Sequence, residues 1–186
     1  MEHEDRTRCD ARHRRFLLPG TNSNTMPTHP SETDLRHLRR CVELATEALH
    51  EGDEPFGSVL VSGDGLVLAE DRNRVSGGDS TRHPEFELAR WAAAHMTPEE
   101  RASATVYTSG EHCPMCAAAH GWVGLGRIVY ASSSAQLTNW LAELGVPPGP
   151  VRPLPISETV PGVTVEGPFP ELAEQVHELH RQFFGR

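Results

Sequence analysis

The chain has 186 residues, of which 37% are hydrophobic and 23% charged, a composition that suits one compact globular domain with a sizeable core. Its 26 acidic and 17 basic residues give a net charge of −9 at pH 7. A field of this sign opposes docking of a phosphate backbone, so nucleic acid is not the expected partner. No apolar run approaches the roughly 20 residues of a membrane span, and no signal-peptide core is present. We therefore expect a cytoplasmic protein without membrane contact.

The first 30 residues differ in composition from the rest of the chain. They are polar, rich in arginine and without a periodic apolar pattern. We predict a disordered N-terminal extension over 1–30, or a start upstream of Met26 that does not belong to the native protein. Residues 31–186 are predicted to form a single domain.

Helical and strand patterns alternate from residue 31 onward. Leu35, Leu38, Val42, Ala45 and Leu49 recur at helical spacing, which predicts an amphipathic helix over 33–50. The other predicted elements are a hairpin over 57–62 and 66–69, helices over 85–95 and from 98, a strand over 105–108, a helix over 114–123, a strand over 127–131, a helix over 135–144, a strand over 163–166 and a helix over 170–183.

Local signals support several of these boundaries. Asp64-Gly65 is typical of a hairpin turn, and Thr97, Pro98 and Glu100 form a capping-box start for a short helix. The proline-rich stretch 146–155 is expected to be a long surface connection. The alternation of helices and strands predicts an α/β domain of three layers, α/β/α, around a mixed sheet of about five strands.

Two short motifs carry the chemistry. His83-Pro84-Glu85 is followed at a distance by Cys113-Pro-Met-Cys116, which supplies three ligands that zinc accepts, and a catalytic zinc site uses three protein ligands and leaves the fourth position to water. His83 and Cys113 each precede a predicted helix, so two helix N-termini should converge on one point. A redox pair is the alternative for the two cysteines, and Cys9 and Cys41 are expected to be unpaired thiols.

These residues resemble the cytidine and purine deaminase superfamily, and the similarity covers roughly 54–131. The resemblance implies a cytidine-deaminase-like fold, Zn²⁺ bound by His83, Cys113 and Cys116, and Glu85 as the catalytic residue that moves protons between water and substrate. Most relatives are dimers or larger, so it also implies a homodimer.

Further positions bear on the substrate. Phe56, in Pro-Phe-Gly, and Asn73 match positions that contact the base in guanine and tRNA adenosine deaminases. Trp122 is similar to a tryptophan that helps to form the base pocket in bacterial guanine deaminases, where the tRNA enzymes usually have histidine. Pro84 replaces the usual alanine and has no N–H to offer a cytosine carbonyl. Glu143 is the nearest match to a carboxylate that binds the base or shuttles protons.

The expected function is hydrolytic deamination of a free purine-type base, with guanine to xanthine and ammonia as the leading case. The alternatives are deamination of another nucleobase, nucleoside or aminated heterocycle (cytosine, cytidine or a triazine), then of tRNA adenosine, and then a non-catalytic zinc-stabilised binding domain. The expected partners are a small nucleobase or nucleoside and water. The roles of His112 and of the C-terminal segment stay open.

Overall fold

The computed structural model describes residues 30–185. The predicted extension over 1–30 lies outside the described residues, apart from its last residue. Within the described part, five strands form one sheet in the order β2-β1-β3-β4-β5. Their bounds are β1 Gly57–Val61, β2 Val67–Arg72, β3 Thr105–Gly110, β4 Arg127–Ser132 and β5 Val165–Glu166.

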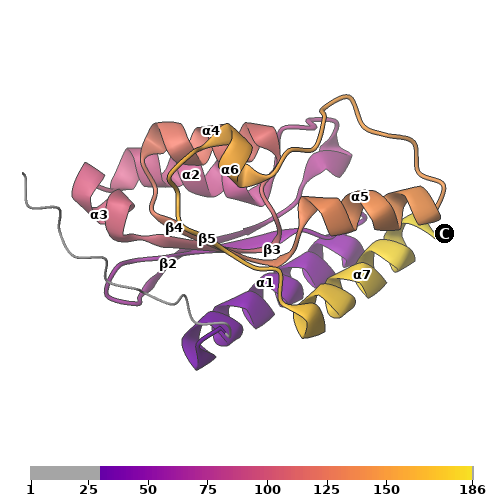
Figure 1. Cartoon of the computed structure of the whole chain (residues 1–186), viewed down its shortest axis with the longest axis horizontal. Coiled ribbons are helices and arrows are strands. Elements are labelled where there is room, and N and C mark those ends of the chain that lie inside the picture. Colours follow the sequence, from indigo (N-terminus) through magenta and orange to yellow (C-terminus); the bar gives the residue numbers. More distant parts are fainter. Residues whose placement is uncertain (1–29, 186) are drawn as a thin grey trace, which may run out of the picture.

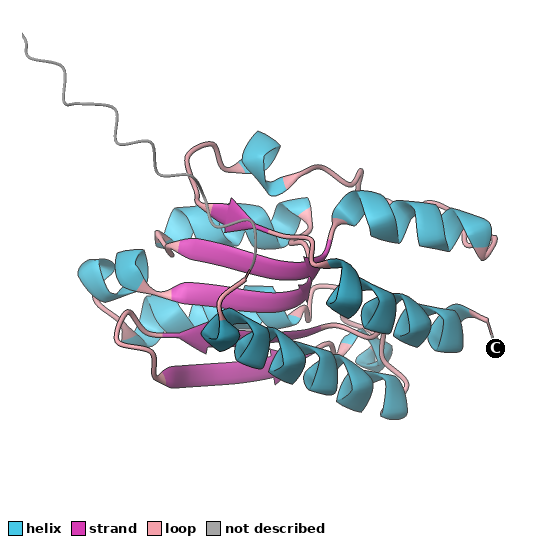
Figure 2. Ribbon diagram, turned by 60° about the horizontal axis from the view of Figure 1, so that its bottom comes forward, coloured by secondary structure: helices cyan, strands magenta, loops and turns pink. Residues whose placement is uncertain are grey.

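Helices cover both faces of this sheet (Figures 1 and 2). They are α1 Glu32–His50, α2 Pro84–His95, α3 Pro98–Ser103, α4 Pro114–Val123, α5 Ser134–Glu143, α6 Ile156–Thr159 and α7 Pro170–Phe184, with a 3-10 turn η1 at Val75–Gly77. On one face α1 and α7 pack on the sheet and on each other, and α5 packs on α7. On the other face α2 contacts β1, β2 and α4, and α4 contacts α6. The predicted three-layer α/β/α architecture is confirmed.

The strand directions decide where side chains gather. β1 is antiparallel to β2 and β3, whereas β3, β4 and β5 are mutually parallel. The start of β1 therefore lies beside the end of β3, with Ser58 opposite Thr108, and β4 ends at the same edge. Ligands of open α/β sheets bind outside the carboxyl ends of parallel strands, so this edge is where a site is expected.

Each face of the sheet has its own apolar core. Leu38, Cys41 and Leu44 of α1 pack with Val59 and Val129 on the α1/α7 face. On the opposite face the buried cluster is formed by Leu60, Leu88, Ala89, Ala92, Ala104, Val106 and Leu125. Burial on both faces explains why β1 is buried along its whole length and why its one polar side chain, Ser58, is hydrogen-bonded.

Capping side chains fix several helix starts. Thr97 accepts a hydrogen bond from the Glu100 N–H, and the Glu100 side chain accepts one from the Thr97 N–H, so the predicted capping box of α3 is confirmed. Ser31 and Asp34 form the same arrangement at α1. These bonds satisfy N–H groups that have no partner within the helix.

Two features differ from the sequence-based expectation. The short helix α6 was not predicted. β5 pairs with β4 over Val165–Glu166 alone, shorter than the predicted strand over 163–166. The proline-rich stretch 146–155 connects α5 with α6 and is mostly exposed, as predicted, and it also lines a cavity. None of the helices within residues 30–185 is long and apolar enough to cross a membrane.

Candidate metal and substrate site

Two helix starts bring the metal-ligand candidates together. His83 is the N-cap of α2 and Cys113 is the N-cap of α4, and these helices pack against each other. Each helix opens with a proline, Pro84 and Pro114, at the position where a missing N–H costs nothing because that group has no partner within the helix. Cys116 lies one turn into α4, so it is on the same side of that helix as Cys113.

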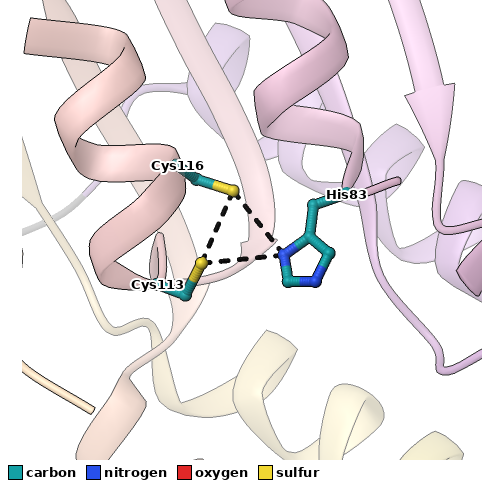
Figure 3. Close-up of side chains that lie close together, drawn as sticks. All are labelled: His83, Cys113 and Cys116. Carbon is teal, nitrogen blue, oxygen red and sulfur yellow. Dashed lines mark hydrogen bonds between the residues drawn. The ribbon is translucent and has the colours of Figure 1, made fainter. Parts of the chain in front are cut away.

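The three donor atoms form a nearly equilateral triangle (Figure 3). Cys113 Sγ and Cys116 Sγ are 3.6 Å apart, and each lies 3.6 Å from His83 Nδ1. Zinc bonds of about 2.3 Å to sulfur and about 2.0 Å to nitrogen at tetrahedral angles place two sulfurs about 3.8 Å apart and sulfur and nitrogen about 3.5 Å apart. The observed triangle fits three ligands of one zinc ion and leaves its fourth corner open.

Charge is already arranged for a cation at this point. The hydrogen bond from the Cys116 thiol and the nearby His83 lower the pKa of Cys113 to about 4. The Cys113 sulfur in turn raises the pKa of His83. Both pKa shifts favour the charged forms of Cys113 and His83, and a metal ion would replace the proton on His83.

Glu85 stands in the first turn of α2, where it is 6% exposed. Its Oε1 atom accepts a hydrogen bond from the Thr108 hydroxyl at 2.8 Å. The Ser58 hydroxyl lies 2.9 Å from the same oxygen and 3.0 Å from Thr108 Oγ1. Burial raises the pKa of Glu85, and the nearby His83 and the Thr108 bond oppose that shift. A carboxylate held in place with a raised pKa is suited to accept and return a proton near neutral pH.

A cavity of about 620 Å³ opens in front of these groups. One side is lined by Phe56, His83, Glu85, Glu111, Cys113 and Pro114. The other 13 of the 19 described residues that line it fall between Ser134 and Pro153, on α5 and the proline-rich connection. We call residues 134–156 the cavity wall. The lining is mainly apolar with a few polar groups, as is usual for small-molecule sites.

Asn73 follows β2 and is 1% exposed. Its N–H donates to the Phe56 carbonyl at 3.0 Å, and the next N–H, of Arg74, donates to the Arg82 carbonyl at 3.1 Å. Asn73 therefore lies between two segments that carry cavity residues. Its Oδ1 atom is buried and has no hydrogen-bond partner within residues 30–185, which leaves an acceptor available.

Of the predicted substrate contacts, Phe56 is among the described residues that line the cavity, whereas Asn73, Pro84, Trp122 and Glu143 are not. Trp122 is 92% exposed, and neither it nor Glu143, which is exposed at the end of α5, is among the lining residues. Along a helix, six positions after Cys116 correspond to about 600° of rotation, so Trp122 points about a third of a turn away from the metal ligands. The contribution of both residues to the base pocket stays a prediction.

Other residues at the site were not predicted as functional. Ser58 and Thr108 carry no motif of their own, and their β1–β3 pairing is what places both hydroxyls on Glu85. Glu111 is close to Cys113 in the sequence, which is a signal that could have singled it out. His112 is buried with its ring centroid 5.5 Å from that of His120, and neither belongs to the group of donors.

A family model described as the cytidine and deoxycytidylate deaminase zinc-binding region matches residues 31–132. The chain belongs to this family. The match contains all three donor residues and Glu85, and the family's zinc-binding character agrees with the geometry of the donors.

The family includes relatives that act on different bases. The chain is 34% identical over 110 residues to a probable cytosine deaminase of Schizosaccharomyces pombe, covering 59% of this chain and 67% of that protein. It is 37% identical over 97 residues to a guanine deaminase of Bacillus subtilis, covering 51% and 62%, less than two thirds of that relative. A solved guanine deaminase of Nitrosomonas europaea has the same fold, with a TM-score of 0.64 and 22% identity over 85% of this chain and 87% of that one.

Proposed function

We propose that this protein is a zinc-dependent hydrolytic deaminase of a free purine-type base, with guanine to xanthine and ammonia as the leading case. The observation that carries the proposal is the placement of Glu85. Its buried carboxylate is fixed by Thr108 and Ser58 at the cavity that His83 and Cys113 also line. A structural zinc site needs no such carboxylate, because its ligands close the coordination sphere.

Each residue of the site then has a role. His83, Cys113 and Cys116 would hold the ion, which when bound would make water acidic enough to be a nucleophile near neutral pH. Glu85 accepts the proton that the attacking water loses and donates it to a ring nitrogen of the base, which makes the amine-bearing carbon more electrophilic. After the hydroxyl group has added to that carbon, Glu85 takes the proton of the hydroxyl group and delivers it to the amine. The C–N bond then breaks, the carbonyl forms and ammonia leaves.

Several features support a purine-type base. The cavity of about 620 Å³ has the size that is usual for small-molecule sites. Phe56 presents an aromatic ring to it. The unpaired Asn73 Oδ1 can accept an N–H of the base. Pro84, buried at the start of α2, has no N–H for a cytosine carbonyl.

The roles of Glu85 and the metal are tested by two substitutions. Glu85→Gln should keep about one zinc per chain and lose at least about 100-fold in turnover, because the amide cannot carry a proton. Cys116→Ala should lose both zinc and turnover, since two donors remain. Elemental analysis and ammonia release measure both effects. Glu87→Gln, on the same helix, is the matched control and should resemble the wild type; a Glu85→Gln variant with normal turnover would contradict the assignment.

A substrate panel tests the identity of the base. The zinc-loaded protein is assayed for ammonia release from guanine, adenine, cytosine, cytidine, an aminotriazine and a tRNA anticodon stem–loop. We expect guanine to be the best substrate and the stem–loop to be inert, because the net charge of −9 repels its phosphates. Turnover of another compound with guanine inert would overturn the choice of base but not the chemistry.

We also propose a homodimer, as the family resemblance implies. Trp122 supports it, since a tryptophan that is 92% exposed in the single chain is of a type enriched at protein interfaces. Sedimentation velocity should give a dimer for the wild type and a shift towards monomer for Trp122→Ser. A monomeric wild type at micromolar concentration would disprove the proposal.

A further inference from the structure

Glu111 lies between the end of β3 and the metal ligand Cys113, and its carboxylate contacts two distant points of the chain. Oε2 accepts a hydrogen bond from the Ser134 N–H at 2.9 Å, and Oε1 accepts one from the Ile156 N–H at 3.0 Å. These two residues are the first and last of the cavity wall (residues 134–156). One side chain therefore holds both ends of the segment that supplies 13 of the 19 described lining residues.

Within residues 30–185, no other side chain accepts a hydrogen bond from either N–H group. Ser134 and Ile156 are the first residues of α5 and α6, where N–H groups have no partner within the helix. The N-cap of α5, Ser133, uses its hydroxyl for the N–H of Gln136. The N-cap of α6 is Pro155, which makes no side-chain capping bond. Without Glu111, two partly buried donors would lose their acceptor.

Glu111 itself is held to the sheet by hydrogen bonds. The Glu111 N–H donates to the Ser132 carbonyl at 2.8 Å, and the Ser132 hydroxyl donates to the Ser109 carbonyl at 2.9 Å. Glu111 is thus tied to the ends of β3 and β4 and is two residues from Cys113. The cavity wall begins with α5 on one face of the sheet and ends at the start of α6 on the other face (Figure 1). The path of the wall therefore depends on where its two ends are held.

We propose that Glu111 is a positioning residue that fixes the cavity wall to the loop carrying the metal ligand Cys113, and thereby sets the shape of the substrate cavity. The inference rests on the proposed function for its effect on substrate. Both carboxylate oxygens are engaged in hydrogen bonds to the backbone, which distinguishes Glu111 from Glu85 and leaves proton transfer to the latter.

The test uses the full-length, zinc-loaded protein with Glu111→Ala, Glu111→Gln and, as a matched control on the exposed side of α6, Glu158→Gln. Residue-resolved hydrogen exchange should show faster exchange of the Ser134 and Ile156 amides in Glu111→Ala. Glu111→Gln keeps a single acceptor oxygen, because its NH₂ group only donates, so only one of the two amides should accelerate. Zinc content should match the wild type in all three variants, and Glu158→Gln should exchange like the wild type.

Kinetics with the substrate found in the panel supply a second readout. KM should rise about tenfold or more in Glu111→Ala, the change expected for loss of a charge-assisted hydrogen bond, while kcat changes less than about threefold. Unchanged exchange at both amides would overturn the proposal, as would faster exchange with an unchanged KM. If the wild type turns over no substrate, the proposed function fails, and the exchange data still decide whether Glu111 holds the wall.

Discussion

The buried carboxylate of Glu85 has one oxygen occupied by hydroxyl groups. Thr108 donates to Oε1 at 2.8 Å, and Ser58 lies 2.9 Å from it. Because hydroxyl donors favour the ionised carboxylate, they limit the rise in pKa that burial produces. They also fix the orientation of the group at the cavity that Glu85 lines.

Thr108→Val tests this arrangement at the level of one hydroxyl group. The variant keeps the branched shape and loses the donor, so we expect kcat to fall about tenfold with zinc retained. Loss of the bond also raises the pKa of Glu85, so the acidic limb of the kcat/KM profile should move to higher pH. Thr105→Val, at the other end of β3, is the control. An unshifted acidic limb would mean that Thr108 does not tune the carboxylate.

The residues of the metal group could be predicted, whereas their neighbours could not. Two short motifs contain His83, Cys113 and Cys116, and a helix was expected to start at each motif. The convergence of the three side chains on one point could therefore be predicted. Ser58 and Thr108 depend on the register between β1 and β3, which no local pattern specifies. The direction of the Trp122 side chain could have been predicted from the sequence, because its position on the helix relative to Cys116 turns it away from the site.

At the scale of elements, α1 is fastened to the sheet by a partly buried cluster of charges. Asp34 Oδ1 accepts hydrogen bonds from Tyr107 Oη of β3 and from Arg127 Nη1 of β4, both at 2.8 Å. Arg127 also pairs with Glu166 of β5. Burial alone raises the pKa of Asp34, but bonds from Arg127, Ser31 and Tyr107 outweigh that effect and hold the pKa well below its usual value. The cluster therefore joins α1 to three neighbouring strands.

Asp34→Asn should destabilise the protein by about 2 kcal/mol at pH 7, since Arg127 and Tyr107 lose a charged hydrogen-bond partner while Arg127 keeps Glu166. A carboxyl group whose pKa is lowered by folding stabilises the protein above the pKa of the unfolded chain, about 3.9, and loses that contribution as the pH falls. The difference in unfolding free energy between wild type and variant should therefore shrink from pH 5 to pH 3. Urea titrations measure it, with Glu32→Gln as the exposed control; a constant difference would contradict the argument.

The elements that were predicted have strong local signals. α1 has apolar residues at helical spacing, α3 has its capping box, and α4 lies between Pro114 and Gly124, which has a φ of 77°. The helix α6 has only four residues and no capping side chain of its own, so its start depends on Glu111, which is distant in sequence. The proline-rich stretch 146–155 is the surface connection that its composition predicted, but composition does not show that this stretch also lines a cavity.

At the scale of the whole molecule, several buried histidines have lowered pKa values. Burial lowers the pKa of His112 and of His120, and burial with the nearby His177 lowers the pKa of His180 to about 3. Both ring nitrogens of His180 lack hydrogen-bond partners within residues 30–185. The unfolded chain binds protons at such residues near pH 6.5, so the stability of the fold should fall as the pH drops below that value.

His180→Leu should reduce this pH dependence. Between pH 7.5 and pH 5.5 a histidine that stays neutral in the fold lowers the unfolding free energy by about 1.4 kcal/mol, so the variant should lose that much less than the wild type over the interval. Denaturant titrations at the two pH values give the difference. Equal losses in both proteins would show that His180 is protonated in the fold.

The composition of the cavity wall has a consequence for how the protein discriminates among ligands. Four of its lining residues are prolines, Pro147, Pro148, Pro150 and Pro153, whose ring fixes the backbone φ angle. A segment restricted in this way loses little conformational entropy when a ligand contacts it. The segment also changes its conformation little to fit a ligand whose shape differs from that of the substrate. We therefore expect selectivity at this site to arise because a preorganised surface does not fit compounds of a different shape. Ligands should enter and leave through the existing opening of the cavity, without the movement of a lid.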